Sequence, residues 1–222
     1  MPRERNPLVR RSGFAQAEKF YILAFEGTVT ERKYFEDLRL SGYFNDSGSI
    51  ETIPLRRSSG QSNNPLAVKA LLKSAKEEYN FRSTDEFWLV IDRDDWENIH
   101  GIDLKALSED CAKEKNFFMA LSNLCFEMWL ILHLAKVSDF TSEEQQAIYD
   151  NAKISDKKHH VDEVLASLIA DGRGYNKRPN PAIFLPRLQT AIANAREVSQ
   201  EGEPYPTSLG SDVYKLVEKL IK

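Results

Sequence analysis

The sequence contains only two cysteines, Cys111 and Cys125, which are too few for a disulfide framework and lie in apolar, helix-like surroundings. It has no run of about 18 apolar residues, so we expect no membrane-spanning helix, and no apolar signal core follows its first residues. Neither charge is in large excess, because the chain has 34 acidic and 30 basic residues. This balance excludes a generally basic nucleic-acid coat, although a local basic groove stays open. We therefore expect a cytoplasmic protein that does not associate with membranes.

Several familiar motifs are also absent. The chain has no Gly-x-x-x-x-Gly-Lys-Ser/Thr loop and no Gly-x-Gly-x-x-Gly turn, and no Ser-His-Asp or Cys-His arrangement stands out. A haloacid-dehalogenase-type phosphatase or a phosphoreceiver domain would carry its acidic pair after the first strand. Here the acidic pair follows the third predicted strand, so the sequence does not support those classes.

An alternation of strands and helices is what the sequence does contain. Its 222 residues, 41% of them hydrophobic, suffice for one large domain. Continuous apolar runs at residues 20–25, 87–91 and 117–121 are typical of strands buried on both faces, and residues 50–55 give a further strand. A helical pattern follows each strand. Four strand–helix units in succession predict an α/β fold of Rossmann-like type, with a mostly parallel four-stranded sheet flanked by helices.

Helix-start signals support this pattern. Short polar side chains stand before the apolar-periodic segments, two of them three residues ahead of a glutamate, which is the spacing of a capping box. The predicted caps are Thr28 with Glu31, Asn64, Asp103, Ser122 with Asn123 before a helix over about 126–135, and Thr141 with Glu144.

Three regions are expected along the chain. Residues 1–19 carry five basic and two acidic side chains and two prolines, and they read as a flexible basic arm. Residues 20–138 contain the predicted strands and form the α/β core. From about residue 140 only helical patterns remain, so residues 139–222 are expected to be a helical extension packed on the core.

Acidic residues follow three of the predicted strands. Glu26 ends the first, Asp92, Asp94 and Asp95 end or follow the third, and Glu127 comes shortly after the fourth. Carboxyl ends of parallel strands meet at one sheet edge, so these side chains should converge, and Glu26 faces the aspartates if the first and third strands are neighbours. Carboxylates about 4 Å apart repel by about 4 kcal/mol at an effective dielectric constant of about 20. A Mg²⁺ or Mn²⁺ ion would remove this conflict; the alternative is that the acids cap helices and stay solvated.

Two basic stretches are candidate nucleic-acid contacts. Arg56 and Arg57 follow the second strand, at the same sheet edge as the acids, beside Ser and Gly residues that a phosphate could approach. Arg173, Lys177 and Arg178 flank a tyrosine that could stack on a base. A solvated loop and a decorated helix end are the respective alternatives.

Histidines and tryptophans are interpreted as structural. His133 lies six residues after Glu127, on a different helix face, which argues against a shared metal. Assistance in proton transfer is the alternative to a structural role for His133. The adjacent His159 and His160 stand in a polar stretch and are expected to be solvated. Packing in the core or at the sheet end is expected for Trp88, Trp96 and Trp129, with contact to a partner as the alternative for Trp96.

Three blocks carry a resemblance to a known family. Glutamate after the first strand and Asp-x-Asp after the third is the pattern of the TOPRIM fold. The blocks are Glu26-Gly-Thr-Val-Thr-Glu-Arg-Lys-Tyr-Phe35, Ile91-Asp-Arg-Asp-Asp95 and Ser122-Asn-Leu-Cys-Phe-Glu-Met-Trp-Leu-Ile-Leu-His133. Together they resemble the RloB family, close to the AbiL-type abortive-infection proteins.

The resemblance implies a metal-dependent nuclease of bacterial phage defence, with RNA, tRNA included, favoured over DNA. It also implies a partner ATPase of the AAA/ABC-like type, encoded alongside. Glu26, Asp92 and Asp94 match the TOPRIM acids as catalytic and metal-binding residues, and Asp95 and Glu127 are neighbours of that set. Three alternatives stay open. Glu26 could act as a general base or acid, and the chain could form a homo-oligomer. The chain could also be a non-catalytic module that binds an ATPase or nucleic acid.

Overall fold

The structure, a computed structural model of the chain, describes residues 19–45, 50–56, 62, 64–78, 81–94, 96–97, 101–156, 158–169, 174–200 and 202–222. The rest of the predicted basic arm, apart from Lys19, lies outside these residues. So do the candidate residues Arg57, Asp95 and Arg173.

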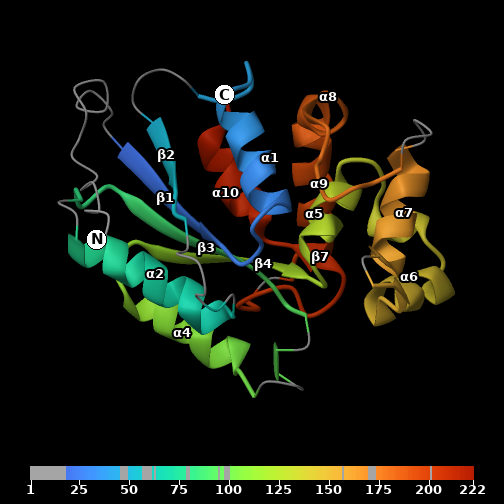
Figure 1. The fold of residues 1–222 in the computed structure, drawn as a ribbon, viewed down its shortest axis with the longest axis horizontal. Coiled ribbons are helices and arrows are strands. Elements are labelled where there is room, and N and C mark those ends of the chain that lie inside the picture. The colour runs from blue at the N-terminus through green and yellow to red at the C-terminus, as the bar shows by residue number, and fades with distance from the viewer. Residues whose placement is uncertain are drawn as a thin grey trace, which may run out of the picture.

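A five-stranded sheet in the order β2-β1-β3-β4-β7 lies at the centre of the fold (Figure 1). The parallel strands are β1 (Lys19–Phe25), β2 (Ile50–Pro54), β3 (Glu86–Asp92) and β4 (Phe117–Asn123). The fifth, β7 (Gly210–Ser211), pairs antiparallel with the end of β4. The prediction of a mostly parallel sheet flanked by helices is confirmed, and the predicted four strands are one too few.

Both faces of the sheet are buried. In β1, alternate residues enter two separate apolar clusters: Tyr21, Leu23 and Phe25 in one, Phe20, Ile22 and Ala24 in the other. The second cluster is covered by α2 (Pro65–Glu78) and α4 (Leu104–Lys113), which contact the strands from one side. The first cluster includes side chains of α1 (Thr30–Arg39), α5 (Phe126–Leu132) and α10 (Val213–Leu220), and these helices lie on the opposite side of the sheet (Figure 1).

The helical extension contains more strand than the sequence indicates. Its elements are η2 (Val137–Asp139), α6 (Ser142–Asp150), β5 (Lys153–Ser155), β6 (Lys158–His159), α7 (His160–Ile169), α8 (Pro181–Phe184), η3 (Leu185–Arg187), α9 (Leu188–Val198), β7 and α10. β5 and β6 form a small antiparallel hairpin. The expectation that strands stop near residue 140 is therefore wrong. Strands of two or three residues are too short to show an apolar pattern, and all three residues of β5 are exposed.

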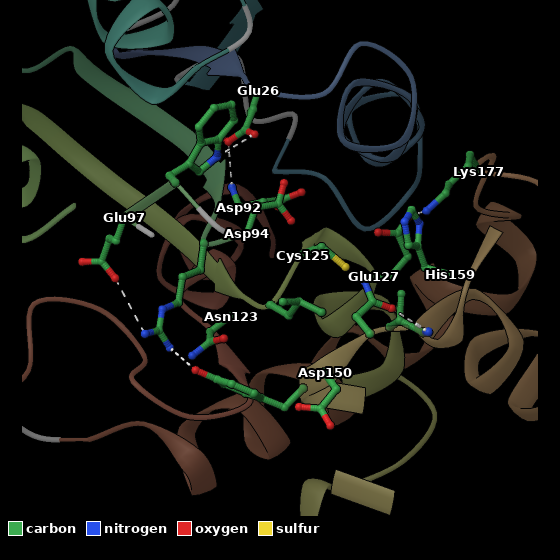
Figure 2. Close-up of a pocket in the computed structure, with 16 residues that line it drawn as sticks. Glu26, Asp92, Asp94, Glu97, Asn123, Cys125, Glu127, Asp150, His159 and Lys177 are labelled. Atoms are coloured by element: carbon green, nitrogen blue, oxygen red, sulfur yellow. Dashed lines mark hydrogen bonds and ion pairs between the residues drawn. The ribbon is translucent and has the colours of Figure 1, made fainter. Parts of the chain in front are cut away.

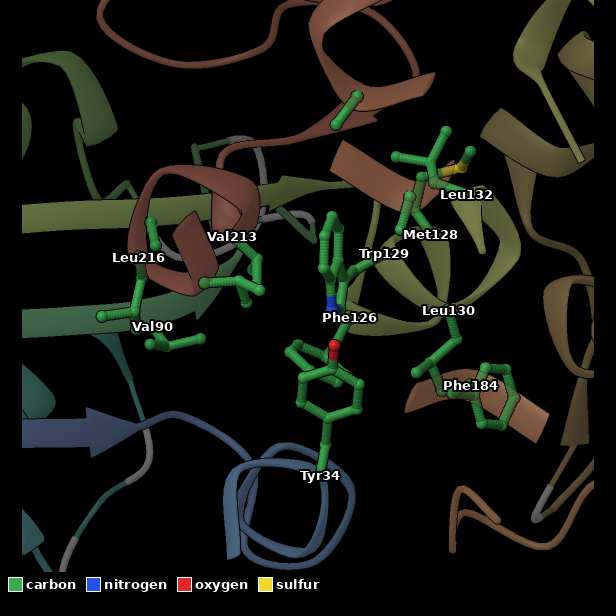
Figure 3. Packing of buried hydrophobic residues seen from close by; sticks show 14 of the residues in the cluster. Tyr34, Val90, Phe126, Met128, Trp129, Leu130, Leu132, Phe184, Val213 and Leu216 are labelled. Carbon is green, nitrogen blue, oxygen red and sulfur yellow. The ribbon is translucent and has the colours of Figure 1, made fainter. Parts of the chain in front are cut away.

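Helix α5 joins the core to the extension. All seven of its residues are buried, and the helix contacts β4 on one side and α7 and α9 on the others. Figure 3 shows Phe126 and Trp129 facing Tyr34 of α1, with ring centroids 5.6 and 6.3 Å from the tyrosine ring. A helix that is apolar all round has to be enclosed by other elements, and here the extension supplies part of the enclosure.

The predicted caps are correct at three places. Asn64, Asp103 and Thr141 each accept a backbone N–H from the first turn of the following helix. Thr28 is not a cap, because α1 begins at Thr30 after Val29 and has no side-chain cap.

Ser122 and Asn123 do not cap α5 either, since both belong to β4. Cys125 precedes α5 without a capping hydrogen bond, and the helix ends at Leu132 rather than near residue 135.

Both cysteines are buried and free. Among the described helices, none has the length and apolar character needed to cross a membrane.

Candidate functional site

A cavity of about 770 Å³ lies at the carboxyl ends of β1, β3 and β4; we refer to it as the acid cavity (Figure 2). The α/β core contributes Glu26, Asp92, Asp94, Cys125 and Glu127 to its lining, among others, and the extension contributes Tyr149, Asp150, Asn151, His159 and Lys177. Four of the five candidate acids are thus brought together, and the fifth, Asp95, lies outside the described residues. Figure 2 shows Asp92 and Asp94 beside Glu26, with Asp150 and Lys177 approaching from the extension.

Glu26 is held against the end of β3 by the pairing of neighbouring strands. Its N–H donates to Val90 O at 3.0 Å, and its Oε2 accepts the N–H of Asp92 at 3.1 Å. The indole Nε1 of Trp96 donates to Oε1 at 3.0 Å. Burial raises the pKa of Glu26 to about 8, with a further contribution from the charge of Asp94, although the hydrogen bond from Asp92 N opposes it.

Asp92 lies among negative charges. Burial raises the pKa of Asp92 well above its ordinary value, and the nearby carboxylates of Glu31, Asp94, Glu26 and Glu127 raise it further. Within the described part of the chain, the carboxylate of Asp92 has no hydrogen-bond or ion-pair partner. This carboxylate is therefore placed where a cation would stabilise it most.

Asp94 has an unusual backbone. Its φ of 36° lies in the left-handed region, which aspartate tolerates better than most residues. Arg93 N and Asp94 N both donate to Leu124 O, at 3.0 and 3.1 Å. These bonds tie the chain after β3 to the loop after β4 and turn Asp94 into the cavity.

Glu31 is an acid of this region that the sequence analysis assigned to a helix cap. It is 4% exposed and lies in the first turn of α1. Its Oε1 accepts the N–H of Gly27 at 2.8 Å, and a Cβ on Gly27 would lie 2.1 Å from a carboxylate oxygen of Glu31. In the sequence, Glu31 stands three residues after Thr28, which is the spacing of a capping box, so no separate signal indicated its place beside the end of β1.

Glu127 is bound by groups of the extension. Its Oε1 accepts from Tyr175 Oη at 3.0 Å and from Lys177 Nζ at 3.0 Å. Lys177 Nζ also pairs with Asp162 at 2.6 Å. Glu127 and Lys177 therefore belong to one ion cluster at the extension side of the acid cavity.

Two further cavity residues were missed as site residues. Trp96 was assigned to packing, yet its indole positions Glu26. His159 was expected to be solvated, yet it lines the cavity from β6. No sequence signal pointed to His159, because only the fold of the hairpin brings it to the strand ends.

Arg93 connects the two halves of the cavity wall. Its Nη1 donates to Tyr149 Oη at 2.9 Å and to Thr207 O at 3.3 Å, and its Nη2 lies 3.7 Å from Glu97. The guanidinium thus turns away from the aspartates on either side of it and links β3 to α6 and to the segment before β7.

The other basic candidates lie apart from the cavity. Arg56 and Arg178 are exposed, and neither is among the described residues that line the acid cavity. His133 is structural, as expected: it is 1% exposed, and burial lowers its pKa to about 3. Its Nδ1 must donate to Trp129 O at 2.9 Å, so Nε2 accepts the hydroxyl of Tyr34 at 3.1 Å.

The acids do not form a ready-made metal cage. Across the residues that the structure describes, no group of three or more His, Cys, Asp or Glu side chains is arranged so that it could hold a metal ion. The carboxylates share a cavity and repel one another, which is a weaker arrangement than a closed ligand set.

Comparison with known proteins identifies a family. The model of the family described as RloB-like protein matches residues 21–220, which is nearly the whole chain. No curated protein and no solved structure matches this chain.

Proposed function

The chain belongs to the RloB-like protein family, and from this premise we propose that it is a metal-dependent phosphodiesterase with a TOPRIM-like core, acting on nucleic acid and on RNA in preference to DNA. One observation carries the proposal. Glu26 follows β1 and Asp92 ends the neighbouring parallel strand β3. The two residues share a hydrogen bond, and the charges that act most strongly on Asp92 are negative. Buried carboxylates gathered in this way are typical of sites that act with a cation.

The donor set fits Mg²⁺ or Mn²⁺. Mg²⁺ is usually bound through one or two carboxylates, with waters and substrate phosphates as its other ligands, so it does not need a cage of three side chains. Asp92 and Asp94 would hold the ion, with Glu26 beside them. When bound, the ion would polarise a phosphate oxygen and lower the pKa of a water molecule.

Protein groups around the ion have separate tasks. Glu26, with its pKa raised to about 8, is suited to take or give a proton near neutral pH, because a general base works best when its pKa is close to the working pH. Trp96 fixes the carboxylate by its hydrogen bond to Oε1. Arg93 keeps the extension against the strand end, so the cavity retains its second wall.

The biological setting that we propose is the one that the resemblance implies. It is an abortive-infection effector in anti-phage defence that works with an AAA/ABC-like ATPase encoded alongside. Such an effector would stay inactive until its partner releases it, so the purified chain alone is not a sufficient test of activity.

A non-catalytic module that binds an ATPase or nucleic acid is the second candidate. The absence of a ready-made cage among the described residues favours it. So does the ion pair between Glu127 and Lys177, because it neutralises one acid of the cavity without any metal.

The test is cleavage of total tRNA and of plasmid DNA with Mg²⁺ or Mn²⁺, with and without the neighbouring ATPase. Asp92→Asn removes a charge while it keeps the side-chain shape, and we expect a loss of about 100-fold or more. Asp156→Asn is the matched control, since the Asp156 side chain is 97% exposed in the extension. Full activity of Asp92→Asn would contradict the proposal. Binding without cleavage in every condition would favour the non-catalytic module.

A further inference from the structure

Carboxylates that line the acid cavity or lie next to it fall into two groups, which are neutralised differently. Asp92 and its neighbours lie at the strand ends, where the charges acting most strongly on Asp92 are negative. Glu127 and Asp162 lie at the extension side, with side chains only 6% and 3% exposed, and both face the same ammonium group. The second group already has its cation.

Lys177 is fixed in this position by several contacts. Its Nζ lies 3.0 Å from Glu127 Oε1 and 2.6 Å from Asp162 Oδ1. Its carbonyl oxygen accepts the hydroxyl of Thr30 at 3.0 Å, which ties the backbone to the start of α1. Tyr175, two residues earlier, donates to the same oxygen of Glu127.

The backbone of Lys177 is also unusual. Its φ of 61° lies in the left-handed region, where glycine or asparagine would be favoured. A lysine with this backbone is retained only when the surrounding structure holds it there, and here the side chain bridges two buried carboxylates.

The carboxylate of Asp162 is oriented towards the ammonium group of Lys177. Its Oδ2 accepts the N–H of His159 at 3.0 Å, which leaves Oδ1 directed at Lys177. The core supplies Glu127 from α5 and the extension supplies Asp162 from α7, so the ammonium group occupies the position that a bridging metal ion would take between two structural elements.

We propose that the Lys177 ammonium is a built-in cation that takes the place of a second divalent ion in the acid cavity. Glu127 is then not a metal ligand, and the cavity holds a single divalent ion at its Asp92 end. The single-ion part rests on the proposed function; the role of Lys177 does not. Lys177 is a positioning residue in this arrangement.

Charge neutrality sets what a variant should do. Lys177→Ala leaves Glu127 and Asp162 buried without a cation, and the space of the ammonium group becomes open to an ion. We expect this variant to gain a Mn²⁺ site made by Glu127 and Asp162. Lys177→Arg keeps the charge and should gain none.

The experiment counts Mn²⁺ ions bound per full-length chain, from the electron paramagnetic resonance signal of free Mn²⁺. We expect one ion in the wild type, in Glu127→Gln and in Lys177→Arg, and a second ion in Lys177→Ala. The double variant Lys177→Ala/Glu127→Gln should return to one ion, and Asp92→Asn should lose the ion of the wild type. Far-ultraviolet circular dichroism reports whether each variant is folded.

Outcomes separate this inference from the proposed function. Loss of an ion in Glu127→Gln, or a folded Lys177→Ala with no additional ion, overturns the role of Lys177 and leaves the proposed function standing. No ion in the wild type, but one in Lys177→Ala that Glu127→Gln removes, contradicts the metal-dependent function and supports the role of Lys177. If Lys177→Ala does not fold, the Glu127→Gln result alone decides.

Discussion

Buried carboxyl groups should make the stability of this protein depend on pH. Glu26 has a pKa near 8 in the folded chain and an ordinary value of 4.5, and the pKa of Asp92 is raised as well. Between the two values for Glu26, the folded state holds a proton that the unfolded state has released. The free energy of unfolding should therefore decrease as the pH rises from about 4.5 to about 8 in the absence of divalent ions.

Urea titrations at about pH 5.5 and pH 8 measure this dependence. Glu26→Gln should reduce the difference between the two pH values, whereas Asp156→Asn, at an exposed position, should leave it as in the wild type. Mg²⁺ should stabilise the wild type more at the higher pH, because an ion favours the charged carboxylates. Equal stability at both pH values would show that these groups are not buried as described.

Gly27 is required by the carboxylate of Glu31. A Cβ at this position would lie 2.1 to 2.5 Å from the carboxyl group, so Gly27→Ala must displace the Glu31 side chain from its hydrogen bond with the backbone. We expect about a tenfold or greater loss of Mn²⁺ affinity or of cleavage, corresponding to about 1.4 kcal/mol. Stability should change by less, because the end of a side chain can move.

Gly42→Ala is the matched control, since a Cβ there meets nothing within 4 Å. It should leave cleavage, Mn²⁺ affinity and stability unchanged. Wild-type function in Gly27→Ala would show that the position of Glu31 does not matter to the site.

Residue-level signals predicted part of the site. Glu26, Asp92 and Asp94 could be placed in advance, because each ends or follows a strand and the rule for parallel sheets sets their common edge. Glu31 could not be placed at the site in advance, because a glutamate three residues after a threonine is also the pattern of a capping box. His159 could not be predicted either, because its place in the cavity depends on how a hairpin from another part of the chain packs.

At the scale of elements, long apolar runs were predictable and short pairings were not. β1 and β3 are buried on both faces, which gave continuous apolar sequence. β7 has only two residues, and it is kept at the sheet edge by pairing with β4 and by contacts with α5 and α9. No periodicity can exist in a strand of that length, so the fifth strand follows from tertiary packing alone.

A buried pair of hydroxyl groups holds β7 to β4. Ser122 Oγ and Ser211 Oγ lie 2.8 Å apart, at 0% and 2% exposure. Ser211→Ala leaves the Ser122 hydroxyl buried without its partner and should cost about 1–3 kcal/mol of unfolding free energy. Ser122→Ala/Ser211→Ala should cost less than the sum of the two single variants, because neither hydroxyl is then left unsatisfied.

Denaturant unfolding of the two single variants and the double variant measures this coupling. Strictly additive losses would mean that the two hydroxyl groups do not interact. Because Asn123, the next residue of β4, lines the acid cavity and donates to Pro206 O, we also expect the single variants to weaken cleavage, through movement of the loop after β4.

For the molecule as a whole, the core and the extension share one apolar cluster. Side chains from β1, β3 and α5 pack in the same cluster as side chains from α7, α9 and α10. The sequence predicted a helical extension packed on the core, because only helical patterns remain after about residue 140. The structure adds that α5, which is apolar all round, is enclosed in part by this extension. It could not predict which helices cover α5, since helical periodicity identifies an apolar face but not its partner.

This shared cluster predicts a single unfolding transition for the whole chain. Leu130, in the middle of α5, is fully buried and lies beside Phe184 of α8 (Figure 3). Leu130→Ala should lower the unfolding free energy by about 2–5 kcal/mol. In a urea titration, the transitions seen by tryptophan fluorescence and by far-ultraviolet circular dichroism should both move to the same lower urea concentration. Leu66→Ala, at a side chain that is 52% exposed, should leave both transitions where they are in the wild type. Separate transitions for the two signals would mean that the extension unfolds independently, and the acid cavity would then lose the wall that carries Tyr149, His159 and Lys177 before the core unfolds.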